Sequence, residues 1–179
     1  MTDRIKVGLI GIGNCFSGLI QGIEYYNKNP SQEVTGIIHD KLAGYGIHDI
    51  DFVCGFDVAE NKVGTPLMNA IYESPNMVNY VAKDDMPKTD AMIYESPLLD
   101  GVGIWVENKI NPLTSTKTDE QLAEEAKKVL KETGAEIIVS YLPVGSDKVT
   151  QFWAQVCLDT GIAFVNCIPS FIASDETWA

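Results

Sequence analysis

The chain has 179 residues and a formal net charge of -12, with 45% hydrophobic and 21% charged residues. This length is typical of one globular domain, which we expect to span residues 1–179. The acidic charge argues against a nucleic-acid partner, because phosphates would be repelled. No apolar run is long enough to span a bilayer, and Met1–Ile5 lacks the features of a signal peptide. We therefore expect a cytoplasmic protein with no membrane partner.

The four cysteines form no Cys-x-x-Cys pair, which favours free thiols over disulfides or zinc ligands. Cys54, Cys157 and Cys167 lie in apolar runs, so we predict that these thiols are buried. Cys15 is different, because it stands where a helix begins and a helix N-terminus favours a thiolate. A small residue that fills a turn is the simpler interpretation of Cys15.

An apolar run ends in two closely spaced glycines near the N-terminus. Residues 5–10 are predicted to form a buried strand and residues 14–26 a helix. Between them, Gly11 would allow a tight turn and Gly13 would let the backbone approach a pyrophosphate. Phe16 occupies the position of the third glycine of the dinucleotide-binding pattern. The turn therefore favours a nucleotide site, and a glycine turn without a ligand is the alternative.

A second predicted strand, 51–58, carries an acid near its C-terminal end. In a dinucleotide fold such an acid accepts hydrogen bonds from the adenosine ribose, and its charge disfavours a 2′-phosphate, so Asp57 predicts NAD rather than NADP. Asp57 lies 44 residues after Gly13, about twice the customary spacing of roughly 20. The loop between Asn27 and Asp51 would have to account for the excess, and we predict that its glycine-rich segment 35–46 is ordered. Alternatively, Asp57 only caps the next helix.

The rest of the chain alternates between predicted helices and strands. We expect helices at 65–73, 119–133 and 146–159, and strands at 78–82, 91–94, 136–146 (ending in polar and turn residues) and 162–167. This alternation predicts a doubly wound parallel α/β sheet. Ligands of such sheets bind at the carboxyl ends of the strands. The candidate loops are 11–15, Asp57, 140–143 and 166–170.

The last residues also carry a local signal. Ser174, Asp175 and Glu176 are typical of a helix N-cap followed by acids in the first turn. A helix that begins where the sequence stops predicts a truncated chain.

Several longer motifs carry a resemblance to a known family. They are 11–15, 22–26, 56–58, 99–103, 139–146, 164–169 and 171–175. Together they resemble the myo-inositol-1-phosphate synthase (inositol-3-phosphate synthase) family in its shorter prokaryotic and archaeal form. The resemblance runs from Val7 to the last residue and includes the unusual segment 36–51. The family's chains are about twice as long, so this chain would be their N-terminal, NAD-binding half, with a Rossmann-like fold.

The resemblance implies an NAD-dependent isomerisation of D-glucose 6-phosphate to 1D-myo-inositol 3-phosphate, by internal oxidation, enolisation, aldol cyclisation and reduction. In the family, the second half of the chain supplies the substrate-binding lysines and the tetramer-forming sheet. The resemblance therefore implies a homotetramer for the full-length form and an inactive chain here. Family members also use a monovalent or divalent cation, but no ligand cluster for one is evident in this sequence.

The same resemblance assigns roles to individual residues. Gly11, Ile12, Gly13, Asn14 and Cys15 would hold the pyrophosphate, Asp57 the adenosine ribose, Ser140 and Tyr141 the wall of the cofactor site, and Asn166 and Asp175 the nicotinamide end. Ser140 could equally just end a strand, and Asp175 could just cap a helix. His39 and His48 each precede an aspartate, but two histidines without a third ligand are more often hydrogen-bonded structure than a metal site.

Two other functions fit the same residues. One is a nucleotide-binding module without catalysis. The other is the N-terminal domain of a dehydrogenase of the homoserine or aspartate type, which also opens with a glycine turn.

Overall fold

The structure is a computed structural model, and it describes residues 4–29, 36–103 and 106–178. Three residues of the predicted turn and loop regions, Pro30, Ser31 and Thr35, lie outside the described residues. Met1–Asp3 and Ala179 lie outside them as well.

A five-stranded parallel sheet forms the centre of the fold. Its strands, in spatial order, are β5 (Met92–Glu95), β4 (Ile50–Asp57), β1 (Ile5–Ile10), β6 (Ile137–Ser140) and β7 (Ala163–Asn166). From β1 the chain builds outward through β4 and β5, then returns to the other side of β1 for β6 and β7. The strand order therefore reverses between β1 and β6, and the predicted doubly wound α/β fold is confirmed.

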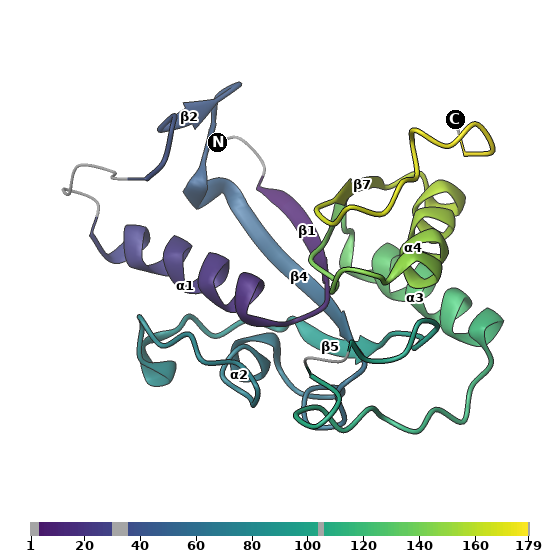
Figure 1. Cartoon of the computed structure of the whole chain (residues 1–179). Coiled ribbons are helices and arrows are strands. Elements are labelled where there is room, and N and C mark those ends of the chain that lie inside the picture. The colour runs from purple at the N-terminus through teal and green to yellow at the C-terminus, as the bar shows by residue number, and fades with distance from the viewer. Residues whose placement is uncertain (1–3, 30–35, 104–105, 179) are drawn as a thin grey trace.

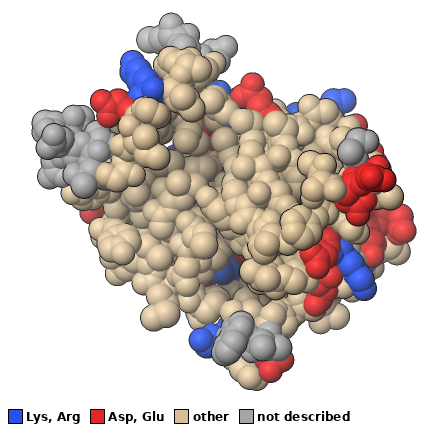
Figure 2. All heavy atoms as spheres, turned by 45° about the horizontal axis from the view of Figure 1, so that its top comes forward, with Lys and Arg blue, Asp and Glu red and all other residues tan. Residues whose placement is uncertain are grey.

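Helices cover both faces of this sheet (Figure 1). One face carries α1 (Asn14–Lys28) and the short α2 (Leu67–Ala70), and the other carries α3 (Asp119–Thr133) and α4 (Asp147–Thr160). Within the described ranges, no helix is both long and apolar enough to cross a membrane. Acidic side chains gather on the α3 and α4 side of the molecule in Figure 2, as expected for the solvated faces of these helices.

Alternation along the strands divides the apolar interior into two clusters, because successive side chains point to opposite faces. Val7 and Leu9 of β1 pack into the cluster under α1 and α2, whereas Ile10 packs into the cluster under α3 and α4. In the second cluster the buried rings of Phe56 and Trp153 have their centroids 4.5 Å apart. Each helix layer is thus fixed to the sheet by its own core.

The predicted strand at 78–82 is wrong, and the Gln21 side chain on α1 explains why. Its Nε2 donates to the carbonyl oxygen of Val78 (3.0 Å), and its Oε1 accepts from the backbone N–H groups of Tyr80 (2.8 Å) and Val81 (3.2 Å). One buried amide therefore satisfies the backbone that a neighbouring strand would otherwise pair. Val81 is buried, as a residue of an inner strand would be, but its backbone N–H bonds a side chain instead of a strand.

Two smaller predictions need adjustment. The segment predicted as an ordered loop contains a two-stranded hairpin, β2 (Lys41–Leu42) and β3 (Tyr45–Gly46), followed by the 3₁₀ turn η1 (Ile47–Asp49). The helix predicted at 65–73 is limited to the four residues of α2. Another 3₁₀ turn, η2, spans Lys83–Asp85.

The end of the described chain also differs from expectation. Asp175 does not start a helix, because residues 172–178 form turns in which its carboxylate accepts from Thr177 N (2.9 Å) and its carbonyl oxygen accepts from Trp178 N (3.0 Å). Cys54 and Cys157 are buried as predicted, but Cys167 is exposed, so the prediction of a buried thiol is wrong there. Cys167 follows the edge strand β7, where little chain covers it.

Replacement of Gln21 by Leu keeps the volume of the side chain but removes its hydrogen bonds to Val78 O, Tyr80 N and Val81 N. We expect the free energy of unfolding to fall by about 2–4 kcal/mol, because buried backbone groups would lose their hydrogen bonds. The exposed Gln155 on α4 provides a matched control, and Gln155→Leu should change stability by less than about 0.5 kcal/mol. Urea unfolding followed by circular dichroism measures both variants, and equal stabilities would contradict this account of the segment.

Candidate functional site

A cavity of about 210 Å³ lies at the carboxyl ends of the strands, where a ligand is expected in a doubly wound sheet. It opens where the strand order reverses, next to the ends of β1, β4 and β6. Five of the predicted site residues line it: Gly11, Gly13, Asn14, Asp57 and Tyr141. The structure thus brings together the glycine turn, the acid of the second long strand and the tyrosine after β6.

The two glycines of the turn have different requirements. Gly11 has a φ of +81°, and a Cβ there would lie 3.2 Å from the carbonyl oxygen of Tyr141. Its N–H donates to Phe56 O (2.9 Å), which fixes the turn to β4. Gly13 has a φ of -91°, and a Cβ there would meet no atom within 4 Å. Conformation and space therefore demand glycine at Gly11, whereas Gly13 leaves open space beside the backbone.

Asp57 points toward the glycine turn from the end of β4. Its Oδ2 accepts from Ile12 N (2.7 Å), and its Oδ1 accepts from Val58 N and Ala59 N (2.8 Å each). The side chain is only 9% exposed. The alternative interpretation expected Asp57 to cap the next helix. Its carboxylate does accept from the residues that follow it, but these form a turn, since α2 begins only at Leu67. A carboxylate has about four acceptor positions, so these three donors leave one.

Two residues in this region were missed by sequence reasoning. The buried Lys62 donates from Nζ to Ile12 O (2.8 Å) and to Asn76 Oδ1 (3.2 Å), and Asn76 Nδ2 also donates to Ile12 O (3.0 Å). Burial lowers the pKa of Lys62, while the negative charges of Asp57 and Glu73 act in the opposite direction. The sequence around Lys62 is that of a solvated turn, so no pattern distinguished it from an exposed lysine.

The N-terminus of α1 faces this cavity without a side-chain cap. Gly13 is its N-cap residue and the first turn contains no acid; among residues 4–29, 36–103 and 106–178, no side chain accepts from that turn. Unpaired N–H groups and the helix dipole make such an end favourable for an anion. By contrast, the N-terminus of α4 is already paired, because the Asp100 carboxylate accepts from Lys148 N (3.2 Å) and Val149 N (2.9 Å).

Two neighbours of the glycine turn complete this part of the site. Phe16, at the position of the missing third glycine, is fully buried and packs on the ring of Tyr141 with centroids 4.5 Å apart. An aromatic contact therefore takes the place of a close glycine contact between helix and strand. Cys15 is exposed in the first turn of α1.

The other five predicted residues do not line the cavity; they are Ile12 and Cys15 of the turn, and Ser140, Asn166 and Asp175. Ser140 is fully buried at the end of β6, and its hydroxyl has no partner within the described part of the chain. Asn166, in the edge strand β7, bonds through its side chain to Ser170 O (2.8 Å) and Ile168 N (3.3 Å). Asp175 lies exposed in the terminal turns. Their cofactor roles remain predictions.

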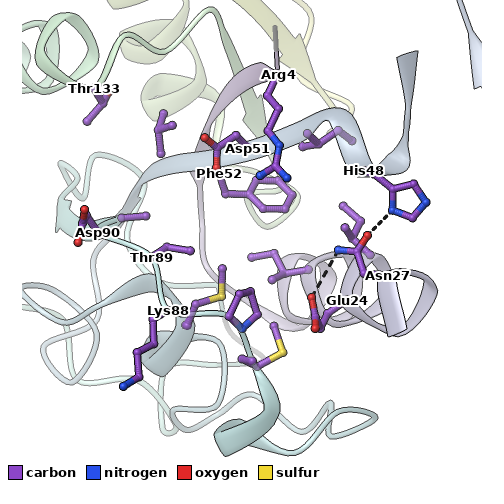
Figure 3. Close-up of a pocket in the computed structure, with 18 residues that line it drawn as sticks. Arg4, Glu24, Asn27, His48, Asp51, Phe52, Lys88, Thr89, Asp90 and Thr133 are labelled. Atoms are coloured by element: carbon purple, nitrogen blue, oxygen red, sulfur yellow. Dashed lines mark hydrogen bonds between the residues drawn. The ribbon is translucent and has the colours of Figure 1, made fainter. Parts of the chain in front are cut away.

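A larger hollow of about 570 Å³ lies at the opposite, amino edge of the sheet (Figure 3). Arg4, Asp51 and Phe52 lie on one side of it. Asn27, on another side, hydrogen-bonds the ring of His48 and the carboxylate of Glu24. None of the predicted cofactor residues lines this hollow. Within the described ranges, no group of three His, Cys, Asp or Glu side chains is placed to hold a metal.

The parallel sheet, its reversal point and its helices on both faces define a Rossmann-like α/β domain. A scan against protein-family models matches none. The chain is 42% identical to the inositol-3-phosphate synthases of Mycolicibacterium smegmatis and Corynebacterium glutamicum, and 39% identical to that of Mycobacterium tuberculosis. Each match covers 99% of this chain and 47% of the relative. The chain is thus similar to inositol-3-phosphate synthases, as its motifs predicted, and spans about half the length of these relatives.

Two solved structures have a similar fold. The crystal structure of Ari2 superimposes with a TM-score of 0.79 at 26% identity, and a myo-inositol-1-phosphate synthase-related protein from Thermotoga maritima with a TM-score of 0.72 at 21% identity. Each match covers 98% of this chain and 50% of the other chain. The second of these similarities concerns the fold alone.

The contrast between the two glycines predicts different effects of alanine on stability. Gly11→Ala should lower the free energy of unfolding by about 1–2 kcal/mol, because alanine is strained at a positive φ and its methyl group would press on Tyr141. Gly13→Ala should stay within about 0.5 kcal/mol of the parent, because its φ is ordinary and the space is open. Thermal unfolding measures both, and a loss at Gly13 as large as at Gly11 would contradict the geometry of the turn.

Proposed function

We propose that this chain binds NAD at the carboxyl-edge cavity and forms the cofactor-binding half of an inositol-3-phosphate synthase. That enzyme would convert D-glucose 6-phosphate to 1D-myo-inositol 3-phosphate. The observation that carries the proposal is the 2.7 Å hydrogen bond from Ile12 N to Asp57 Oδ2. This bond places the Asp57 carboxylate next to the glycine turn. The adenosine ribose and the pyrophosphate of one ligand would then be bound side by side.

The residues around the cavity fit this ligand. The open space at Gly13 gives room for a pyrophosphate against the uncapped N-terminus of α1. The remaining acceptor position of Asp57 suits a ribose hydroxyl, and its negative charge would repel the 2′-phosphate of NADP. Gly11, Ile12, Asn14 and Cys15 would complete the phosphate-binding turn. Tyr141 would form the wall on the β6 side.

In this reaction a bound NAD would supply a reversible hydride acceptor, which an internal oxidation followed by a reduction requires. The part of the chain described here would bind and orient the cofactor and exclude water from it. No catalytic group is assigned to this chain, since the family's substrate-binding lysines belong to the second half. Glucose 6-phosphate as substrate, a homotetramer, a cation and a cytoplasmic location remain predictions from the family resemblance.

NAD binding is tested most directly at Gly13. Gly13→Ala places a methyl group in the space proposed for the pyrophosphate, so we expect affinity for NAD to fall about tenfold or more, as overpacking by about 1–3 kcal/mol implies. Gly22→Ala is the matched control, because a Cβ at Gly22 on α1 also meets no atom within 4 Å. Isothermal titration calorimetry gives both dissociation constants. Equal affinity of the two variants would contradict a pyrophosphate beside Gly13.

The reaction is tested with isotope-labelled glucose 6-phosphate and NAD. The purified chain should form no inositol phosphate, whereas a chimera that joins it to the remaining part of the M. smegmatis relative should form the product without net NADH. Accumulation of NADH would instead support a dehydrogenase. A folded chimera that binds NAD but yields neither product would support the non-catalytic module.

A further inference from the structure

Lys62 is buried in a way that the proposed function does not yet explain. Its side chain is only 2% exposed, although lysines are almost never fully buried unless they are paired. Within the described ranges, Lys62 forms no ion pair with an acidic side chain closer than 4.0 Å. Its Nζ is instead directed at two neutral oxygens, of which one is the carbonyl oxygen of Ile12. Burying a charge for these contacts is costly, so they require a reason.

The reason lies in what surrounds Ile12, the residue between the two glycines. Its N–H donates to Asp57 Oδ2 at 2.7 Å, and its carbonyl oxygen accepts from Lys62 Nζ at 2.8 Å and from Asn76 Nδ2 at 3.0 Å. Charge-assisted hydrogen bonds are roughly twice as strong as neutral ones. The N–H group of Ile12 is therefore held by a negatively charged side chain, and its carbonyl oxygen is held by a positively charged one. Lys62 and Asp57 together form a clamp on the glycine turn.

The clamp determines the orientation of the next residues. Ile12 O belongs to the peptide group that also contains Gly13 N, so a donor on that oxygen sets the direction of the Gly13 amide. Gly13 N donates to Gly11 O at 2.8 Å, and Ser17 N donates to Gly13 O at 3.0 Å, where α1 begins. Glycine at positions 11 and 13 makes this segment intrinsically free to rotate. The clamp restricts backbone rotation in this segment, where the first N–H groups of α1 face the cavity.

We propose that Lys62 is a positioning residue that holds the glycine turn in its anion-binding conformation before the cofactor arrives. This inference rests on the proposed function. A site that is ordered in advance does not lose affinity to ordering on binding. The positive charge of Lys62 also compensates Asp57, so the carboxylate repels an incoming pyrophosphate less. Lys62 would contact neither the reacting atoms nor the substrate.

A purely structural role would make a different prediction. If Lys62 only attached the turn after β4 to the core, its loss would lower stability and weaken every ligand alike. If it positions the glycine turn, ligands with a pyrophosphate must be affected far more than ligands without one. Adenosine, ADP and NAD separate these cases, because adenosine contacts the Asp57 side of the cavity without a phosphate.

The experiment compares the parent chain with Lys62→Met and with Lys62→Gln, which keeps a hydrogen-bond donor without the charge. Lys128→Met is the control, because Lys128 lies exposed on α3 with only a 3.8 Å ion pair to Glu132. We expect Lys62→Met to weaken NAD and ADP about tenfold to a hundredfold, the range for a lost hydrogen bond to a charged group, and adenosine less than about twofold. Lys62→Gln should lie between the parent and Lys62→Met.

A second measurement needs no ligand and covers the case in which one variant folds poorly. Amide hydrogen exchange at Gly13 should be at least about tenfold faster in folded Lys62→Gln, with exchange at Leu9 in the centre of β1 unchanged. Equal losses for adenosine, ADP and NAD, or unchanged exchange at Gly13, would overturn the positioning role. If the parent chain binds none of the three ligands, the proposed function fails, whereas the exchange result still decides whether the clamp exists.

Discussion

The bond between Asp57 and the backbone of Ile12 is the constraint on which the rest of the site depends. β1 and β4 are neighbours in the sheet, so their carboxyl ends lie side by side, but adjacency alone does not shape a binding surface. The Asp57 carboxylate determines the shape of this surface, because it accepts hydrogen bonds from the N–H groups of Ile12, Val58 and Ala59. The turn after β4, which carries Lys62, starts from the same carboxylate. Asp57 therefore contributes to both sides of the clamp: it bonds Ile12 directly, and the turn that carries Lys62 begins at it.

The two halves of the sheet contribute differently to the cavity. The β4 side provides hydrogen bonds and charge through Asp57, Lys62 and Asn76, whereas the β6 side provides an aromatic wall through Tyr141 and its contact with Phe16. This division follows from the reversal of strand order between β1 and β6. The helix after β1 crosses to one side and the two later helices cover the other, so the ends of β1 and β6 remain open between them.

Much of this architecture was predictable because it depends on patterns of period two and 3.6. The strands β1, β4 and β5 were predictable as apolar runs, and the helix α3, which is followed by Gly134 at φ +68°, was predictable from its helical spacing. What was missed depends on single side chains that bond across long sequence separations. Gln21 replaces a strand partner for residues 78–81, and Lys62 reaches Ile12 fifty residues away. No local pattern encodes such contacts, since both residues are of types that usually face water.

The bonds of α1 to the segment that follows α2 have a mechanical consequence. Asn14 Oδ1 accepts from Met77 N at 2.7 Å at the first turn of the helix, and Gln21 holds Tyr80 and Val81 two turns later. Hydrogen bonds thus join α1 and residues 77–81 at two points along the helix. A displacement of the N-terminus of α1 would therefore also displace residues 77–81, because these hydrogen bonds attach them to the helix. Asn76, next to this segment, lines the carboxyl-edge cavity, so a shift of α1 would change the shape of the cavity at more than the glycine turn.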